Sequence, residues 1–227
     1  MESVTQDREC QSSDAVISRD ADENLIHTTS APTTITKLCV SIDGADDNIL
    51  PEIDSLKLDP IILKFQNLVI TMNLLETASR QVQSTPKLHR LITRDCTVDQ
   101  DVTLKTVFTR FPTINTVIGS NIDLNTGSII ELVRLGVRNL IRIEAKGHLE
   151  DAHLWGLDYL DVFFRSQYPG FILAIRLVNN PNENAITARM NALLPKTFHH
   201  EEFSDSNLTS VLRFNDTVHY VFQPNRL

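Results

Sequence analysis

Two short runs of the sequence hold residue types that could bind a metal ion or transfer protons. His199-His200-Glu201-Glu202 gathers imidazoles and carboxylates, while His148 and His153 flank Glu150 and Asp151. Adjacent histidines point to opposite faces of a strand and diverge on a helix. Neither run has the i, i+4 spacing by which one helix presents two zinc ligands. We therefore expect a solvated loop at 199–202, a structural role for His148 and no metal site.

Residues suited to nucleophilic catalysis or phosphate binding are present without the patterns that these chemistries need. The sequence has no GxSxG motif, and Gly127-Ser128 lacks the neighbouring glycines of a phosphate-binding loop. Cys39 and Cys96 fall at apolar positions of a repeating pattern, where a thiol packs as a small hydrophobe. We predict no enzymatic activity and no cofactor. The alternative is a small α/β enzyme with a site near His148 and His153, which would need a deep pocket with converging polar groups.

Composition and charge narrow the class of function further. The 227 residues carry a formal net charge of -8 and no basic run, which argues against nucleic acid as a partner. No apolar run approaches the roughly 18 residues of a membrane span, and the N-terminal residues are too polar for a signal peptide. Three cysteines without a CxxC pair argue against a disulfide framework. We expect an intracellular protein, cytoplasmic or nuclear, that stays out of the membrane.

The chain divides into two regions of different composition. Residues 1–33 are rich in Ser, Thr, Asp and Glu and nearly free of large apolar side chains. Such a segment buries too little surface to offset its ordering entropy. We expect a disordered polar tail over 1–33 and a single α/β domain over 34–227, whose first strand is Ile35–Ile42.

Apolar residues recur every 26 residues through the first half of this domain. The equivalent positions are Ile62, Leu88, Ile114 and Leu140, then Phe65, Leu91, Val117 and Ile143, with Pro60, Pro86 and Pro112 at the start of three units. This period is typical of leucine-rich repeats, in which each strand–helix unit shields its apolar side against its neighbours. We predict a leucine-rich-repeat-like stack of units of about 26 residues, with a parallel sheet on one face and helices on the other. The other interpretation is an ordinary α/β fold with evenly spaced elements.

The individual elements follow from periodicity and from turn residues. Helices are expected at Asp101–Phe111, Asn125–Leu135, Leu149–Gln167 and Glu183–Leu194, and a strand at Phe171–Val178. Asn125 or Thr126 suits an N-cap, and Gly136 suits a helix C-terminus. Two apolar runs around Asn215-Asp216-Thr217 predict a C-terminal hairpin that would cap the stack.

A polar sheet face is the expected binding surface of such a stack. It would carry Lys37, Lys64, His89, Arg90, Asn115, Thr116, Arg142 and Glu144. Trp155 shares a helical spacing with Tyr159 and Phe163, so it either packs in the core or anchors a partner. The candidate partner-binding residues are therefore Arg90, Arg142, Glu144 and Trp155, and the partner would be a protein. A third hypothesis is a structural component that oligomerises through an exposed sheet edge.

Four segments resemble the substrate-side region of nematode F-box proteins, the F-box-associated and related domains. They are 35–42, 86–91, 111–114 and 137–143, within a similarity that covers roughly residues 35–225. The resemblance implies a degenerate leucine-rich-repeat fold that recognises substrates for a ubiquitin ligase. In that family an F-box docks on a Skp1-type adaptor, but residues 1–33 are too short and too polar to form one. The resemblance therefore implies protein binding without adaptor docking.

Overall fold

The computed structural model describes residues 15–19, 25–27, 34–35, 39–44, 57–58, 60–82, 88–119, 121–201 and 209–224. The strands of its large sheet are β1 (Ala15–Arg19), β2 (Leu25–His27), β4 (Cys39–Asp43), β6 (Ile62–Gln66), β8 (Arg90–Arg94), β10 (Thr116–Ile118), β11 (Arg142–Gly147), β12 (Ile172–Leu177), β13 (Phe198–His200), β14 (Val211–Phe214) and β15 (Val218–Phe222). Two further pairs lie outside it, β3 (Thr34–Ile35) with β5 (Lys57–Leu58) and β7 (Val69–Ile70) with β9 (Thr97–Val98).

The described helices connect successive strands. They are α2 (Met72–Val82), α3 (Leu104–Arg110), α4 (Ser128–Arg134), the 3₁₀ turns η2 (Leu149–Leu154) and η3 (Leu157–Tyr159), α5 (Leu160–Arg165) and α6 (Glu183–Leu193). A parallel pair of neighbouring strands needs such a crossover, and a helix with one apolar face supplies it.

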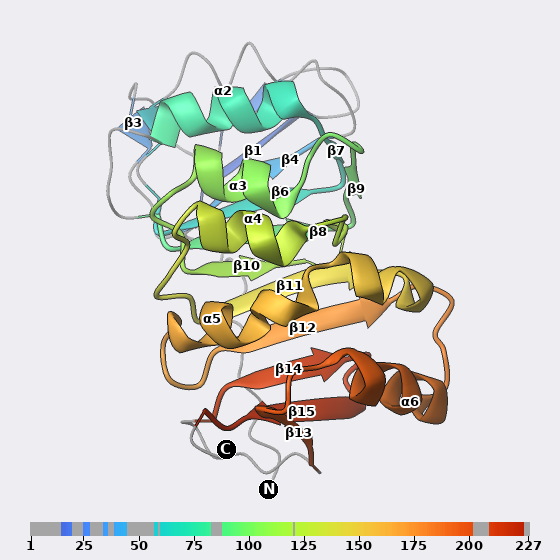
Figure 1. Ribbon diagram of the computed structural model, residues 1–227. Coiled ribbons are helices and arrows are strands. Elements are labelled where there is room, and N and C mark those ends of the chain that lie inside the picture. The colour runs from blue at the N-terminus through green and yellow to red at the C-terminus, as the bar shows by residue number, and fades with distance from the viewer. Residues whose placement is uncertain are drawn as a thin grey trace, which may run out of the picture.

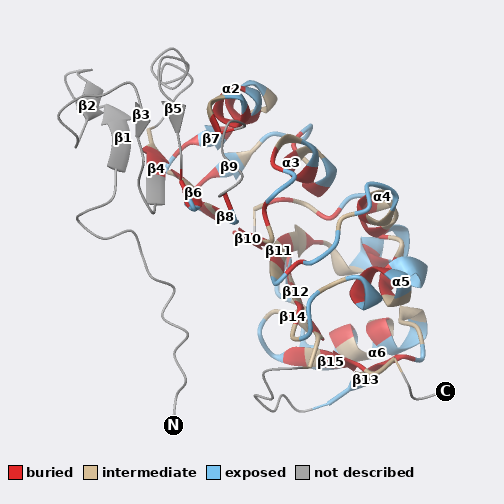
Figure 2. Ribbon diagram, turned by 90° about the vertical axis from the view of Figure 1, so that its left-hand side faces the viewer, coloured by how far each residue is buried: buried red, intermediate tan, exposed pale blue. Residues whose placement is uncertain are grey.

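The large sheet is mostly parallel and carries its helices on one side. Within the described residues its order is β13-β15-β14-β12-β11-β10-β8-β6-β4-β1-β2. All neighbours from β1 through β14 pair in parallel, whereas β1–β2, β14–β15 and β13–β15 are antiparallel. Helices α2 to α6 stack in chain order along one face (Figures 1 and 2). The predicted α/β class, with a parallel sheet on one face and helices on the other, is confirmed.

The register of the strands agrees with the 26-residue spacing in part of the sheet. Leu91 pairs with Val117, and Val117 pairs with Ile143, so these three predicted equivalents lie side by side. Phe65 does not belong with them, because Leu91 pairs with Leu63 instead. The link from β6 to β8 is thus two residues longer than the following links. The β11–β12 pairing, Arg142 with Ile172, lengthens the spacing again.

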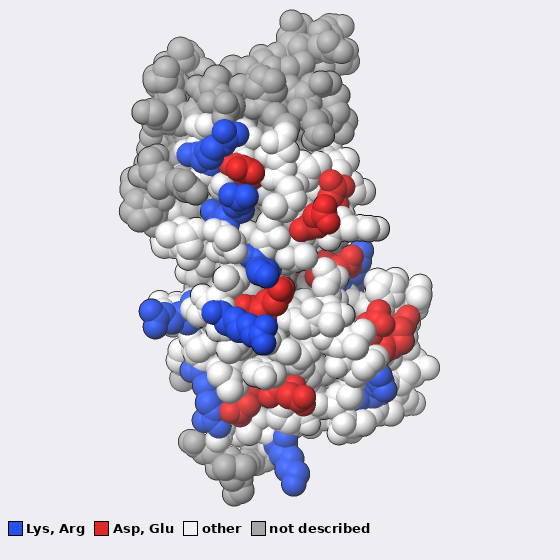
Figure 3. Space-filling model, turned by 45° about the horizontal axis from the view of Figure 1, so that its top comes forward, with Lys and Arg blue, Asp and Glu red and all other residues white. Residues whose placement is uncertain are grey.

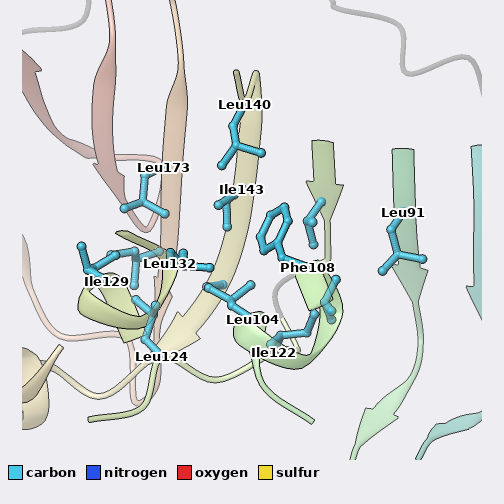
Figure 4. Packing of buried hydrophobic residues seen from close by; sticks show 14 of the residues in the cluster. Leu91, Leu104, Phe108, Ile122, Leu124, Ile129, Leu132, Leu140, Ile143 and Leu173 are labelled. Atoms are coloured by element: carbon cyan, nitrogen blue, oxygen red, sulfur yellow. The ribbon is translucent and has the colours of Figure 1, made fainter. Parts of the chain in front are cut away.

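The core fills the space between the sheet and the helices. Leu91, Ile143 and Leu173 point from the strands towards Leu104 and Phe108 of α3 and Ile129 and Leu132 of α4 (Figure 4). All of them are buried. At about 25 cal/mol per Å² of apolar surface removed from water, this layer supplies the main stabilisation of the fold.

The N-terminal expectation needs a correction. Residues 1–33 were expected to be disordered, but β1 and β2 lie within this segment, and β1 pairs in parallel with β4. The β-branched pair Val16-Ile17 explains why a strand forms inside a polar region. The predicted strand over 35–42 is also divided between β3 and β4. The rest of 1–33 lies outside the described residues.

The helix predicted over 149–167 is wrong as one continuous element. It consists of η2, η3 and α5, and the break falls at Gly156, whose φ is +84°. A Cβ at this glycine would lie 2.7 Å from Cγ1 of Ile130, so α4 packs too closely for any other residue. Gly156 was a visible breaker signal in an otherwise helical pattern.

Both ends of α4 illustrate what local sequence does and does not specify. The N-terminus is at Gly127 (φ +74°) and not at Asn125 or Thr126; the Ser128 hydroxyl binds the backbone of Asn125 instead. At the other end the prediction is correct. Gly136 has φ +67°, and the amides of Gly136 and Val137 donate to the carbonyls of Val133 and Leu132. This is the Schellman arrangement that favours glycine.

The C-terminal elements agree with the predicted strands. Phe214 pairs with Val218 across a tight turn, so β14 and β15 form the expected hairpin. The outer strand β15 is in turn paired with β13. His199 and His200 belong to β13 and not to a loop, which corrects that prediction.

Candidate binding surface

One side of the large sheet carries none of the described helices, and we call this side the open face. Because side chains alternate along a strand, the residues between the buried ones of each strand point to it. One row across the sheet consists of Ile62, Arg90, Thr116, Arg142 and Ile172. The next row consists of Lys64, Ile92, Ile118, Glu144, Ala174 and Arg213. Three candidate residues, Arg90, Arg142 and Glu144, therefore share one surface.

The expected members of this surface divide into two groups. Arg90, Thr116, Arg142, Glu144 and Lys64 lie in the strands, as predicted. His89 and Asn115 instead precede their strands and line a second depression with Tyr168, at the start of the strands. Lys37 lies outside the described residues.

Glu144 is held by the protein itself. Its Oε2 accepts the backbone N–H of Gly119 at 3.1 Å, and its Oε1 pairs with Nη2 of Arg142 at 2.5 Å. Both oxygens are therefore engaged, and the carboxylate joins the end of β10 to the guanidinium two residues before it on β11. Glu144 positions Arg142 on the open face and is less available to a partner than the sequence suggested.

A hollow of about 420 Å³, open to solvent, lies beside this pair. Its lining includes Arg142, Glu144, Ala174, Arg176 and Arg213. Ala174 pairs in register with Glu144 on one side and with Arg213 on the other. A methyl group between two long side chains leaves space above it, and this accounts for the hollow.

The cations of the open face differ in how far they are neutralised. Arg142 pairs with Glu144, and Arg213 pairs with Asp216 at 2.8 Å. Arg90 and Arg176 are exposed, and neither forms an ion pair with another described residue. These two guanidinium groups keep all their hydrogen-bond donors for a ligand.

The helix side of the molecule has a different charge arrangement. Lys, Arg, Asp and Glu are interspersed over it (Figure 3). Arg110 of α3 pairs with Glu76 of α2 at 3.4 Å, and Lys105 pairs with Glu131 of α4 at 2.9 Å. These exposed pairs link successive helices and contribute little stability, each about 0–1 kcal/mol.

Trp155 does not lie on any surface. Its side chain is 0% exposed and belongs to the main core. A Cβ on Gly147 would approach its Cζ2 to 2.5 Å, so the indole fills the space above this glycine of β11. A buried indole cannot contact a partner, and Trp155 is therefore removed from the candidate binding residues.

The residues of the enzyme alternative take part in separate interactions. His148 lies 3.6 Å from Glu150, and Nδ1 of His153 lies 3.0 Å from the Glu150 carbonyl oxygen and 3.2 Å from Nη2 of Arg189. Neither histidine lines the hollow or the second depression. In the part of the chain that the structure describes, no group of three His, Cys, Asp or Glu residues is arranged to hold a metal ion.

The remaining candidate groups also lie apart. His199 pairs with Val221 and His200 with Tyr220, so the two rings lie on opposite sides of β13. Cys96 is a buried free thiol, and burial raises its pKa. A raised pKa keeps the thiol protonated and unreactive at neutral pH.

His219 links the open face to pH. It pairs in register with Arg213. Burial is the main cause that lowers its pKa, repulsion by Arg213 adds to this, Asp216 acts in the opposite direction, and His200 makes a smaller lowering contribution. The unfolded chain therefore binds a proton near the ordinary pKa of about 6.5, while the folded chain binds it only at lower pH.

We accordingly expect the free energy of unfolding to be constant above about pH 7 and to fall as the pH drops through about 6.5. Urea unfolding at pH 7.5 and pH 5.5 measures this loss. The variant His219→Gln should lose less stability between these two pH values than the natural chain. An equal loss in both proteins would show that His219 titrates alike in the folded and unfolded states.

Sequence reasoning missed Ala174, Arg176 and Arg213. They lie on β12 and β14, beyond the part of the chain that repeats every 26 residues, so periodicity could not align them with Arg142. One signal was available: Arg176 is the single charged residue within the strand expected at Phe171–Val178. A charge at an alternate position of a strand marks its solvent face.

The chain was compared with protein-family models, with curated proteins and with solved structures, and no match was found. None of the described helices has the length and apolar character needed to cross a membrane.

Proposed function

We propose that this chain is a non-catalytic protein-interaction module that receives a polypeptide partner on its open face. The observation that carries the proposal is the combination of a helix-free sheet face with Arg90 and Arg176, which are exposed and unpaired among the described residues. Arginine is favoured at protein interfaces because its planar guanidinium forms several directional hydrogen bonds. A flat row of side chains in fixed register suits an extended surface of contact better than it suits catalysis.

We further propose that the sheet is built from leucine-rich-repeat-like units, with the C-terminal hairpin shielding one end. The matching register of β8, β10 and β11 supports this. The two longer links, to β6 and to β12, make the units irregular. Kinship with F-box-associated domains is part of the same proposal and would make the partner a substrate of a ubiquitin ligase.

The proposal is tested by panning a displayed peptide library against the full chain and then measuring the affinity of the selected peptides. Charge reversal by Arg90→Glu or Arg176→Glu should weaken them about tenfold or more, equivalent to about 1.4 kcal/mol. The matched control is Arg134→Glu in the last turn of α4, which changes the net charge equally on the helix side. Peptides that bind the two open-face variants as tightly as they bind the natural chain would contradict the proposal.

The rival assignment to an oligomeric structural component makes a different prediction. Light scattering should give a monomer if the open face is free for another protein. A stable oligomer in which Arg176→Glu dissociates the subunits would show that the face binds a second copy instead.

A further inference from the structure

The hollow above Ala174 is a binding site of definite chemistry, and its identification rests on the proposed function of the open face. Ala174 forms its floor, and Arg142, Arg176 and Arg213 contribute to its lining. These arginines come from three adjacent strands, β11, β12 and β14. Three guanidinium groups therefore surround a space large enough for a small polar group.

The arginines retain donors that the protein does not use. Arg142 and Arg213 each give one Nη2 to an acidic residue, and their Nε atoms are buried without an acceptor among the described residues. Arg176 has no ion pair in that part of the chain. Guanidinium groups with free N–H donors bind oxyanions by paired, charge-assisted hydrogen bonds.

The balance of charge around the hollow selects among oxyanions. Glu144 and Asp216 also line it, so three cations face two carboxylates. The remaining charge matches a singly charged carboxylate, and the two acids would repel a doubly charged phosphate. Beyond the hollow, Arg142, Thr116 and Arg90 continue across β11, β10 and β8. A second carboxylate on the same ligand could thus reach Arg90.

The spacing of these two positions suggests the form of the ligand. From Ala174 on β12 to Arg90 on β8 is three strand intervals, roughly 14 Å at about 4.8 Å per interval. An extended polypeptide covers this in about four residues at about 3.3 Å each. Residues four apart also point to the same side of an extended segment.

We propose that the open face recognises an acidic, extended polypeptide segment, and that one Asp or Glu carboxylate of this segment is bound in the hollow above Ala174. The probe is a fluorescein-labelled ten-residue peptide with two glutamates four positions apart among Gly and Ser. Its control has glutamine at both positions. Binding to the full chain is measured by fluorescence anisotropy at low and physiological ionic strength.

The glutamate peptide should bind at least tenfold more tightly than the glutamine peptide, and added salt should weaken it, because screening acts on exposed charges. Ala174→Leu fills the hollow without changing charge and should weaken binding about tenfold. Arg176→Gln, at an exposed and unpaired position, tests the same site if Ala174→Leu fails to fold. Arg134→Gln on the helix side should leave the affinity unchanged.

Equal binding of the two peptides, or full affinity in both Ala174→Leu and Arg176→Gln, would overturn the inference. So would a phosphoserine peptide or a single-stranded oligonucleotide that binds more tightly than the glutamate peptide. If library peptides bind the open face but are not acidic, this inference fails while the proposed function stands. If no peptide depends on the open face, both fail.

Discussion

Replacing Trp155 with alanine is expected to lower the free energy of unfolding by about 3–5 kcal/mol. The side chain is completely buried, and its ring lies against Gly147 on β11. The backbone around it is fixed as well, because the Trp155 carbonyl accepts the Ile129 amide at 3.0 Å. Removing the ring leaves a cavity that neither neighbour can fill. A loss of this size is a large share of the roughly 5–15 kcal/mol that stabilises a typical domain.

The measurement is urea unfolding followed by far-UV circular dichroism, because the substitution removes the chain's single tryptophan. Tyr159→Ala is the matched control: this neighbouring aromatic residue is 44% exposed, so its loss should cost about 1 kcal/mol or less. Trp155→Phe should fall between the two, since it also removes a buried indole N–H that has no acceptor among the described residues. Similar costs for Trp155→Ala and Tyr159→Ala would contradict the buried position.

Replacing Gly119 with alanine is expected to cost roughly 2–5 kcal/mol, because two penalties combine. The first is conformational: φ is +138°, a region that is essentially confined to glycine. The second is steric, because a Cβ would lie 1.9 Å from the Thr93 hydroxyl oxygen and 2.7 Å from the Thr93 carbonyl oxygen. The carbonyl belongs to the backbone of β8 and cannot rotate away. The same glycine donates its N–H to Glu144, so the change also disturbs the support of Arg142.

Gly127→Ala separates the two penalties. Gly127 also has a positive φ, +74°, but a Cβ there would meet no atom within 4 Å. It should therefore cost about 1–2 kcal/mol, the conformational part alone. In the Gly119→Ala background, Thr93→Ala should recover part of the loss by removing the hydroxyl. If Gly119→Ala were no more destabilising than Gly127→Ala by urea unfolding, the close packing of β10 against β8 would be wrong.

The sequence predicted the fold class because its strongest signal is geometric. Leu91, Val117 and Ile143 are neighbours in the sheet since equal spacing along the chain produces equal register. Phe65 was misaligned because the link between β6 and β8 contains two more residues, and hydrophobic type alone does not distinguish Phe65 from Leu63. The breaks at Gly156 and Gly127 depend on backbone conformation, which periodicity does not report.

The candidate surface was predictable only where the spacing held. Arg90 and Arg142 were found because they occupy equivalent positions, and Thr116 between them shares the row. Trp155 was ambiguous, since an aromatic residue at helical spacing suits a core and an interface equally. The hollow above Ala174 could not be foreseen, because it depends on a small residue placed between Glu144 and Arg213 by pairings across separate connections.

Photo-crosslinking from the two sides of the sheet tests most directly whether the open face is the binding surface. A benzophenone amino acid is placed either at Ile92, in the middle of the open face, or at Val162 of α5, which is 55% exposed on the helix side. Each full-length variant is irradiated with a peptide selected by the natural chain. We predict a covalent product from position 92 and none from position 162. A product from position 162, with none from position 92, would contradict the account.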